Sequence, residues 1–140
     1  MKLDAETLTR LIIITNTFVF LAFGVAFLAA PEFLAKQLDI QLVSSTGFAD
    51  FRAMYGGLPL ACGLLFALSL SKRDWLLPSL FLVAASSAGL LSGRVYSTLV
   101  SGTPSATIFM FSAMEFGSFL LAAGCYRALS KRDLISVPAE

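Results

Sequence analysis

Four long stretches of this 140-residue chain contain no charged residue, and their lengths constrain the fold more than any other feature. They cover residues 11–31, 53–71, 75–93 and 95–114. A helix needs about 20 mostly apolar residues to cross the hydrocarbon layer of a membrane, because each residue advances the helix by about 1.5 Å. The sequence therefore predicts four membrane-spanning helices, at about residues 8–30, 48–71, 75–100 and 107–129.

The composition agrees with a chain embedded in lipid. Hydrophobic residues make up 57% of the chain and charged residues 14%, which is about half the usual charged share of a soluble domain. The net charge of +1 by itself argues neither for nor against a nucleic-acid partner, and none is predicted. The predicted surroundings are the lipid bilayer.

The segment after the first predicted span has a different pattern. Pro31 should end the span, and residues 31–42 would form a short helix with apolar side chains on one face: Phe33, Leu34, Leu38 and Leu42. We predict that this amphipathic helix lies on the membrane surface, although an ordinary connector would show the same pattern. The expected fold is therefore all-α: a single transmembrane domain over residues 1–140, built as a four-helix bundle with an interfacial helix between the first two spans.

Basic residues are distributed unevenly over the segments that flank the spans. One predicted side has only Lys36, whereas the other has seven: Lys2, Arg10, Lys72, Arg73, Arg127, Lys131 and Arg132. Lysine and arginine near membrane spans favour the cytoplasmic side. The sequence thus predicts a multi-pass protein of the inner (plasma) membrane with both termini in the cytoplasm.

Small residues recur every four positions in three of the predicted spans. The stripes are Ala22, Ala26 and Ala30; Ala53, Gly57 and Ala61; and Ala85, Gly89, Gly93 and Ser97. Because lipid provides little hydrophobic drive between helices, close approach through small residues is a main source of helix association in membranes. We predict that these stripes pack the bundle and, as a second possibility, contact a membrane-protein partner or another copy of the chain.

Charged residues inside the predicted spans are the candidate functional residues, because a charge is costly there and usually faces a partner or a cavity. Arg52, Arg94 and Glu115 should lie at similar depths in the outer half of the bundle. Tyr55 should lie one turn below Arg52, and Asp50 near the outer interface. These five residues are the predicted ligand-binding candidates.

Three interpretations of this cluster remain open. In the leading hypothesis, the arginines bind a lipid-like or amphipathic anionic molecule beside an apolar cleft, without catalysis. In the second, Glu115 pairs with Arg94 or Arg52, and the chain is a structural or assembly subunit of a membrane complex. In the third, Glu115 and Tyr55 transfer protons in a cofactor-free membrane enzyme, such as an isomerase.

The sequence lacks residues that several classes of functional site require. The chain has no histidine, which excludes histidine-ligated haem, copper, zinc and di-iron sites formed by this chain alone. Cys62 and Cys125 lie in different predicted spans without the C-x-x-C spacing of a redox or metal site, so we interpret both as packing residues. No catalytic residue, metal ligand or cofactor is predicted.

The polar residues also occur in a characteristic order. An R-x-x-Y-G-G element is followed by one arginine and one glutamate in later spans: Asp50, Arg52, Tyr55, Gly56, Gly57, Arg94 and Glu115. This order resembles the small bacterial four-helix membrane proteins grouped as domain of unknown function 4345, with a more distant resemblance to the DoxX-like group. The resemblance implies a four-span bacterial inner-membrane protein with an Arg–Arg–Glu set, and it brings no established activity. The DoxX-like link implies a quinone or an oxidoreductase as a partner, but nothing in the sequence binds a redox centre.

Overall fold

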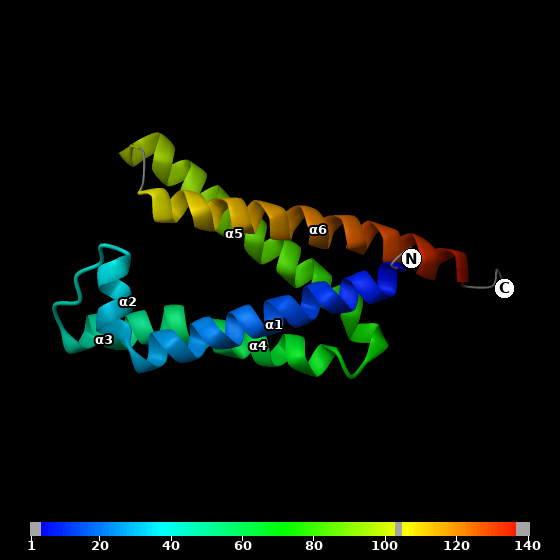
Figure 1. Ribbon diagram of the computed structural model, residues 1–140, viewed down its shortest axis with the longest axis horizontal. Coiled ribbons are helices and arrows are strands. Elements are labelled where there is room, and N and C mark those ends of the chain that lie inside the picture. The colour runs from blue at the N-terminus through cyan, green and yellow to red at the C-terminus, as the bar shows by residue number, and fades with distance from the viewer. Residues whose placement is uncertain (1–3, 103–104, 137–140) are drawn as a thin grey trace. The chain divides into compact units, whose positions relative to one another are not determined.

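The computed structural model describes residues 4–102 and 105–136, with residues 131–136 as backbone only, and within these ranges every regular element is a helix (Figure 1). Lys2 and the side chains of Lys131 and Arg132 lie outside the described part. The elements are α1 (Ala5–Ala29), α2 (Pro31–Gln37), α3 (Ser45–Phe51), the π-helix η1 (Arg52–Gly57), α4 (Leu58–Ser69), the 3₁₀-helix η2 (Arg73–Trp75), α5 (Leu76–Ser101) and α6 (Ala106–Ser136).

Within the described part of the chain, four helical stretches are long and apolar enough to cross a membrane. They are Ala5–Ala29, Ser45–Ser69, Arg73–Ser101 and Ala106–Ser130. The second stretch consists of α3, η1 and α4 in direct succession, and the third consists of η2 and α5. The predicted all-α fold with four membrane-length helices is therefore confirmed.

Local chemistry explains where several of these helices begin and end. The hydroxyl of Ser44 accepts a hydrogen bond from the backbone N–H of Gly47 at 3.1 Å, which caps the start of α3. Pro31 occupies the first position of α2, where its missing N–H costs nothing. Gly102 ends α5 with a φ of 91°, a conformation that residues with a Cβ rarely adopt.

The helix after Pro31 is shorter than predicted, because it ends at Gln37 and not near residue 42. Asp39 has a φ of 57°, and the N–H of Ile40 donates to the carbonyl of Ala35 at 2.9 Å. The N–H of Asp39 also donates to the carbonyl of Lys36. These two bonds form a Schellman motif, which turns the chain out of the helix and brings Ile40 back onto Ala35. The predicted location of α2 on the membrane surface stays a prediction.

The second span contains a feature that the sequence did not predict. Residues Arg52–Gly57 form a π-helix between α3 and α4. A π-turn is wider than an α-turn, so one extra residue is accommodated and all later side chains point in a new direction around the helix axis. A four-residue spacing therefore does not mark one face of the helix across this segment.

The chain divides into two compact units. The first unit contains Met1–Ile12 and Lys72–Glu140, and the second contains Ile13–Ser71. In the first unit, α5 and α6 pack along each other as a hairpin. Its buried side chains come from the start of α1, from α5 and from α6: Thr9, Ile12, Leu76, Ser79, Leu80, Val83, Ser87, Ala122, Cys125 and Leu129.

In the second unit, α1 packs closely against the second span through three glycines. A Cβ added to Gly24 would lie 2.8 Å from the Cβ of Leu60, and one added to Gly63 would lie 2.8 Å from the side chain of Leu21. A Cβ on Gly56 would lie 2.7 Å from the side chain of Leu28. None of these positions has room for a larger residue without movement of its neighbours, so the glycines set the distance between the two helices.

Within the second unit, the predicted packing stripes of the first two spans do not form the contact between these spans. Their packing in the whole bundle, or against a partner, stays a prediction. Ala22, Ala26, Ala53 and Ala61 are all exposed. The physical reason is that bulky aromatic side chains determine the rotation of these helices. Phe27, Phe51 and Phe66 are at most 6% exposed, and Phe66 meets the ring of Phe20 edge-on at 5.4 Å. In addition, the π-helix interrupts the four-residue spacing of the second stripe.

The predicted stripe on the third span also does not contact the helix beside it in the first unit. Ala85, Gly89, Gly93 and Ser97 are exposed, and a Cβ added to either glycine would have no heavy atom within 4 Å. The face of α5 that packs in this unit carries Leu76, Leu80 and Val83 instead. The packing of all four spans as one bundle stays a prediction.

Candidate functional site

Two of the predicted site residues form an ion pair in the first unit. Nη1 of Arg94, on α5, lies 2.6 Å from Oε2 of Glu115, on α6. The side chains are 26% and 16% exposed, and the two contacting atoms are themselves buried. The guanidinium also lies over the ring of Phe111, with Cζ 5.6 Å from the ring centroid. Each charge therefore neutralises the other within the α5–α6 hairpin.

Hydroxyl groups beside this pair are directed to the helix backbone. Thr98 donates to the carbonyl of Arg94 at 2.8 Å, and Ser112 donates to the carbonyl of Ile108 at 2.8 Å. Ser112 lies one turn before Glu115, but its proton is thus not directed to the carboxylate. The pair matches the arrangement expected for a link that holds two helices in register.

The other three predicted site residues lie in the second unit, so the predicted meeting of Arg52 with Arg94 and Glu115 stays a prediction. Arg52 is exposed at the start of η1, with its Cζ 5.9 Å from the ring centroid of Phe48. Asp50 is exposed on α3. Tyr55 is 43% exposed, and its ring packs against Phe27 at 5.5 Å and Phe51 at 4.7 Å between centroids. Tyr55 therefore belongs to the edge of an aromatic cluster.

A cleft of about 330 Å³ opens beside Arg52 in this unit. Its other walls come from the end of α1 and the start of α2: Ala29, Ala30, Pro31, Glu32 and Phe33. The buried ring of Pro31 holds the corner between the two helices. The cleft thus combines one cation and one carboxylate with an aromatic side chain that is 63% exposed, Phe33.

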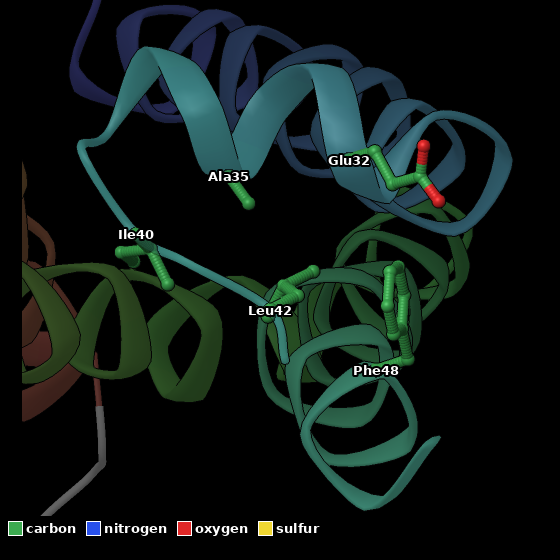
Figure 2. Close-up of a pocket in the computed structure, with 5 residues that line it drawn as sticks. All are labelled: Glu32, Ala35, Ile40, Leu42 and Phe48. Carbon is green, nitrogen blue, oxygen red and sulfur yellow. The ribbon is translucent and has the colours of Figure 1, made fainter. Parts of the chain in front are cut away.

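A second cleft, of about 350 Å³, also borders α2 (Figure 2). Glu32 and Ala35 form the wall contributed by α2, and the remaining wall comes from the chain that follows it: Ile40, Leu42 and Phe48. This cleft is mainly apolar. Glu32 is the residue common to both clefts.

Sequence reasoning missed Glu32 as a site residue. Glu32 is not one of the residues on the predicted apolar face of the helix after Pro31, and a solvated carboxylate is usual on the polar face of such a helix. The only available signal was that Glu32 directly follows a proline at the end of a membrane span. Its position across a cleft from Arg52 depends on the corner between α1 and α2.

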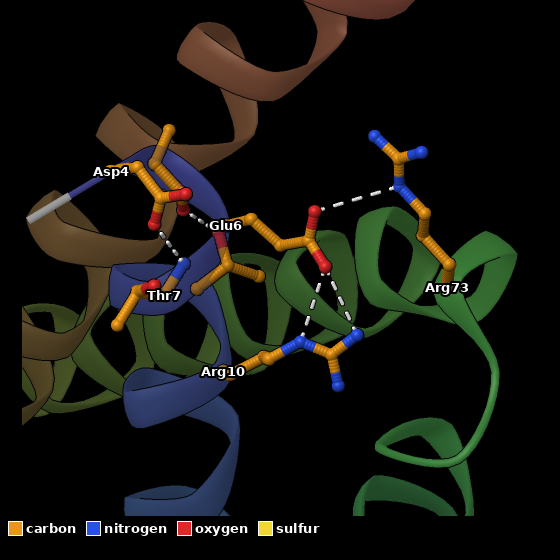
Figure 3. A network of polar contacts seen from close by, with 7 residues as sticks. Asp4, Glu6, Thr7, Arg10 and Arg73 are labelled. Carbon is orange, nitrogen blue, oxygen red and sulfur yellow. Dashed lines mark hydrogen bonds and ion pairs between the residues drawn. The ribbon is translucent and has the colours of Figure 1, made fainter.

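A separate polar network lies at the other end of α1 (Figure 3). Glu6 pairs with Arg10 at 3.0 Å and with Arg73 at 3.6 Å, so it links the first turns of α1 to η2 within the first unit. Asp4 accepts a hydrogen bond from the N–H of Thr7 at 2.9 Å and caps the start of the helix. Within the described residues, no group of three His, Cys, Asp or Glu side chains is arranged to hold a metal ion.

These features define a helical protein with four membrane-length segments, a charged pair between two of them and a charged cleft at a helix corner. The chain belongs to the family described as Domain of unknown function (DUF4345), whose family model matches residues 8–125. The match includes the R-x-x-Y-G-G element, Arg94 and Glu115, and it confirms the resemblance to this family. The bacterial origin and the DoxX-like link stay predictions. No curated protein and no solved structure matches the chain.

Proposed function

We propose that this is a non-enzymatic membrane protein that binds the charged head group of a lipid-like or amphipathic anionic molecule at Arg52. The observation that supports this most directly is the cleft of about 330 Å³ beside an exposed guanidinium. Among the described residues, Arg52 forms no ion pair, whereas Arg94 is already neutralised by Glu115. A guanidinium binds phosphate or carboxylate through two parallel hydrogen bonds. Phe33 provides apolar surface at the rim for a hydrocarbon chain.

We also propose that the cleft opens at the outer surface of a bacterial inner membrane, with both termini in the cytoplasm. The uneven distribution of basic residues supports this orientation. The ion pairs of Glu6 with Arg10 and Arg73 are consistent with it, because they place the start of α1 and the segment before α5 at one end of the first unit. The corner between α1 and α2 then lies at the level of the outer head groups.

Native mass spectrometry in detergent tests the proposal. The probe is phosphatidylglycerol of one acyl composition, titrated into the wild type and into Arg52→Gln. A charge-assisted hydrogen bond contributes about 1.5–3 kcal/mol, and about 1.4 kcal/mol corresponds to a factor of ten in affinity. We therefore expect Arg52→Gln to weaken binding by about tenfold.

The matched control is Lys36→Gln, which removes one positive charge from an exposed residue of α2 that does not line the cleft. This variant should bind phosphatidylglycerol as the wild type does. Equal binding by wild type and Arg52→Gln would refute the proposal. An equal loss in both variants would also refute it, because the effect would then depend on net charge and not on the cleft.

A second candidate function is a structural or assembly subunit of a membrane complex. The internal Arg94–Glu115 pair supports it, and so does the stripe on α5 that no neighbouring side chain covers within the first unit. For the enzymatic alternative, Glu115 and Tyr55 belong to different units, and each is engaged by other residues. Proton transfer by these two residues stays a prediction of the sequence alone.

A further inference from the structure

The cleft beside Arg52 contains a second, opposite charge. Glu32 is exposed on the first turn of α2 and lines the same cleft as Arg52. Among the described residues, neither side chain lies within 4.0 Å of an oppositely charged group. Unlike Arg94 and Glu115, these two charges share a cavity without neutralising each other.

Two separated and opposite charges are complementary to a ligand that carries both. A simple anion would be attracted to Arg52, but it would meet the carboxylate of Glu32 in the same small cleft, and like charges at short range are unfavourable. A head group with a phosphate and an ammonium avoids this conflict. Its phosphate accepts hydrogen bonds from the guanidinium, and its ammonium has three N–H donors for the carboxylate.

We propose that the cleft binds the phosphoethanolamine head group of a phospholipid, with the phosphate at Arg52 and the primary ammonium at Glu32. This inference rests on the proposed function, because it keeps an anionic phosphate at Arg52, and it changes the expected ligand from a purely anionic head group to one that also carries an ammonium. The volume of about 330 Å³ lies at the lower end of the range for small-molecule sites, which suits a head group whose acyl chains stay outside. Phe33, at the edge of the cleft, is placed to contact the first segment of an acyl chain.

The two charged residues have different roles in this arrangement. Arg52 contributes to the binding of any phospholipid that has an accessible phosphate. Glu32 contributes only when the head group also has an amine, and it disfavours head groups without one. Selectivity between phosphatidylethanolamine and phosphatidylglycerol therefore depends on Glu32, whereas the affinity for both depends on Arg52.

The experiment measures binding of these two lipids, with identical acyl chains, by native mass spectrometry of the full chain in detergent. The wild type should prefer phosphatidylethanolamine by about tenfold. Glu32→Gln should abolish this preference and leave phosphatidylglycerol binding equal or stronger. Glu32→Lys should reverse the preference. Asp39→Asn is the matched control, because it removes one negative charge from the same segment at a residue that does not line the cleft.

The outcomes separate this inference from the proposed function. Suppose that Arg52→Gln weakens the binding of both lipids, but Glu32→Gln keeps the wild-type preference for phosphatidylethanolamine. The head-group assignment is then wrong and the proposed function stands. If Arg52→Gln changes the binding of neither lipid, the head-group assignment and the proposed function are both wrong. Soluble phosphoethanolamine is the third probe. If this compound competes with the lipid at equal concentration, the inference that the bound head group belongs to a phospholipid is wrong.

Discussion

Neutralising Glu115 should destabilise the α5–α6 hairpin through the charge that remains on Arg94. Glu115→Gln keeps the shape of the side chain but leaves the guanidinium without its partner at 2.6 Å. Breaking a fully buried pair costs about 3–5 kcal/mol, and breaking an exposed one costs about 0–1 kcal/mol. With side chains 26% and 16% exposed, the pair lies between these limits, so we expect a loss of about 2 kcal/mol in the free energy of unfolding.

The assay is unfolding in mixed detergent micelles, followed by circular dichroism, for the two single variants and the double variant. Arg94→Met removes the other charge and keeps most of the side-chain stem. The double variant Arg94→Met/Glu115→Gln leaves neither charge unpaired, so its loss should be about 1–2 kcal/mol smaller than the sum of the single losses. The exposed Arg127→Gln is the control and should be close to neutral. Strictly additive losses for Arg94 and Glu115 would refute the coupling.

Two further predictions concern the glycines. Gly24→Ala should destabilise the second unit by about 1–3 kcal/mol, because the new Cβ would lie 2.8 Å from the backbone nitrogen of Leu60, which cannot move as a side chain can. Gly117→Ala, with no heavy atom within 4 Å of the new Cβ, is the matched control and should raise stability by about 0.5–1 kcal/mol in the same unfolding assay. If the uncovered stripe on α5 joins two copies of the chain, Gly89→Leu should convert a wild-type oligomer into a monomer, as measured by light scattering in detergent. A wild-type monomer, or an oligomer that survives this change, would contradict an interface on this face.

The pairing of Arg94 with Glu115 was predictable in part, because the depth of a residue in the membrane can be counted along the sequence. Arg94 precedes the end of one span, and Glu115 follows the start of the next, so their depths were expected to match. The structure contains one of the two pairings that the sequence left open, Arg94 with Glu115. The cleft beside Arg52 was not predictable in the same way, because Glu32 reaches it only through the corner at Pro31.

The number and approximate extent of the membrane-length helices were determined by the sequence alone. Crossing a membrane depends on length and apolar content, which are local properties of each segment. Tertiary structure alone decided which face of each helix packs. Burial of Phe27, Phe51 and Phe66 rotates the first two spans so that Gly24 and Gly63, and not the alanine stripes, lie at the contact. This outcome depends on the shapes of side chains from distant segments. The spacing of residues within one helix contains no information about those shapes.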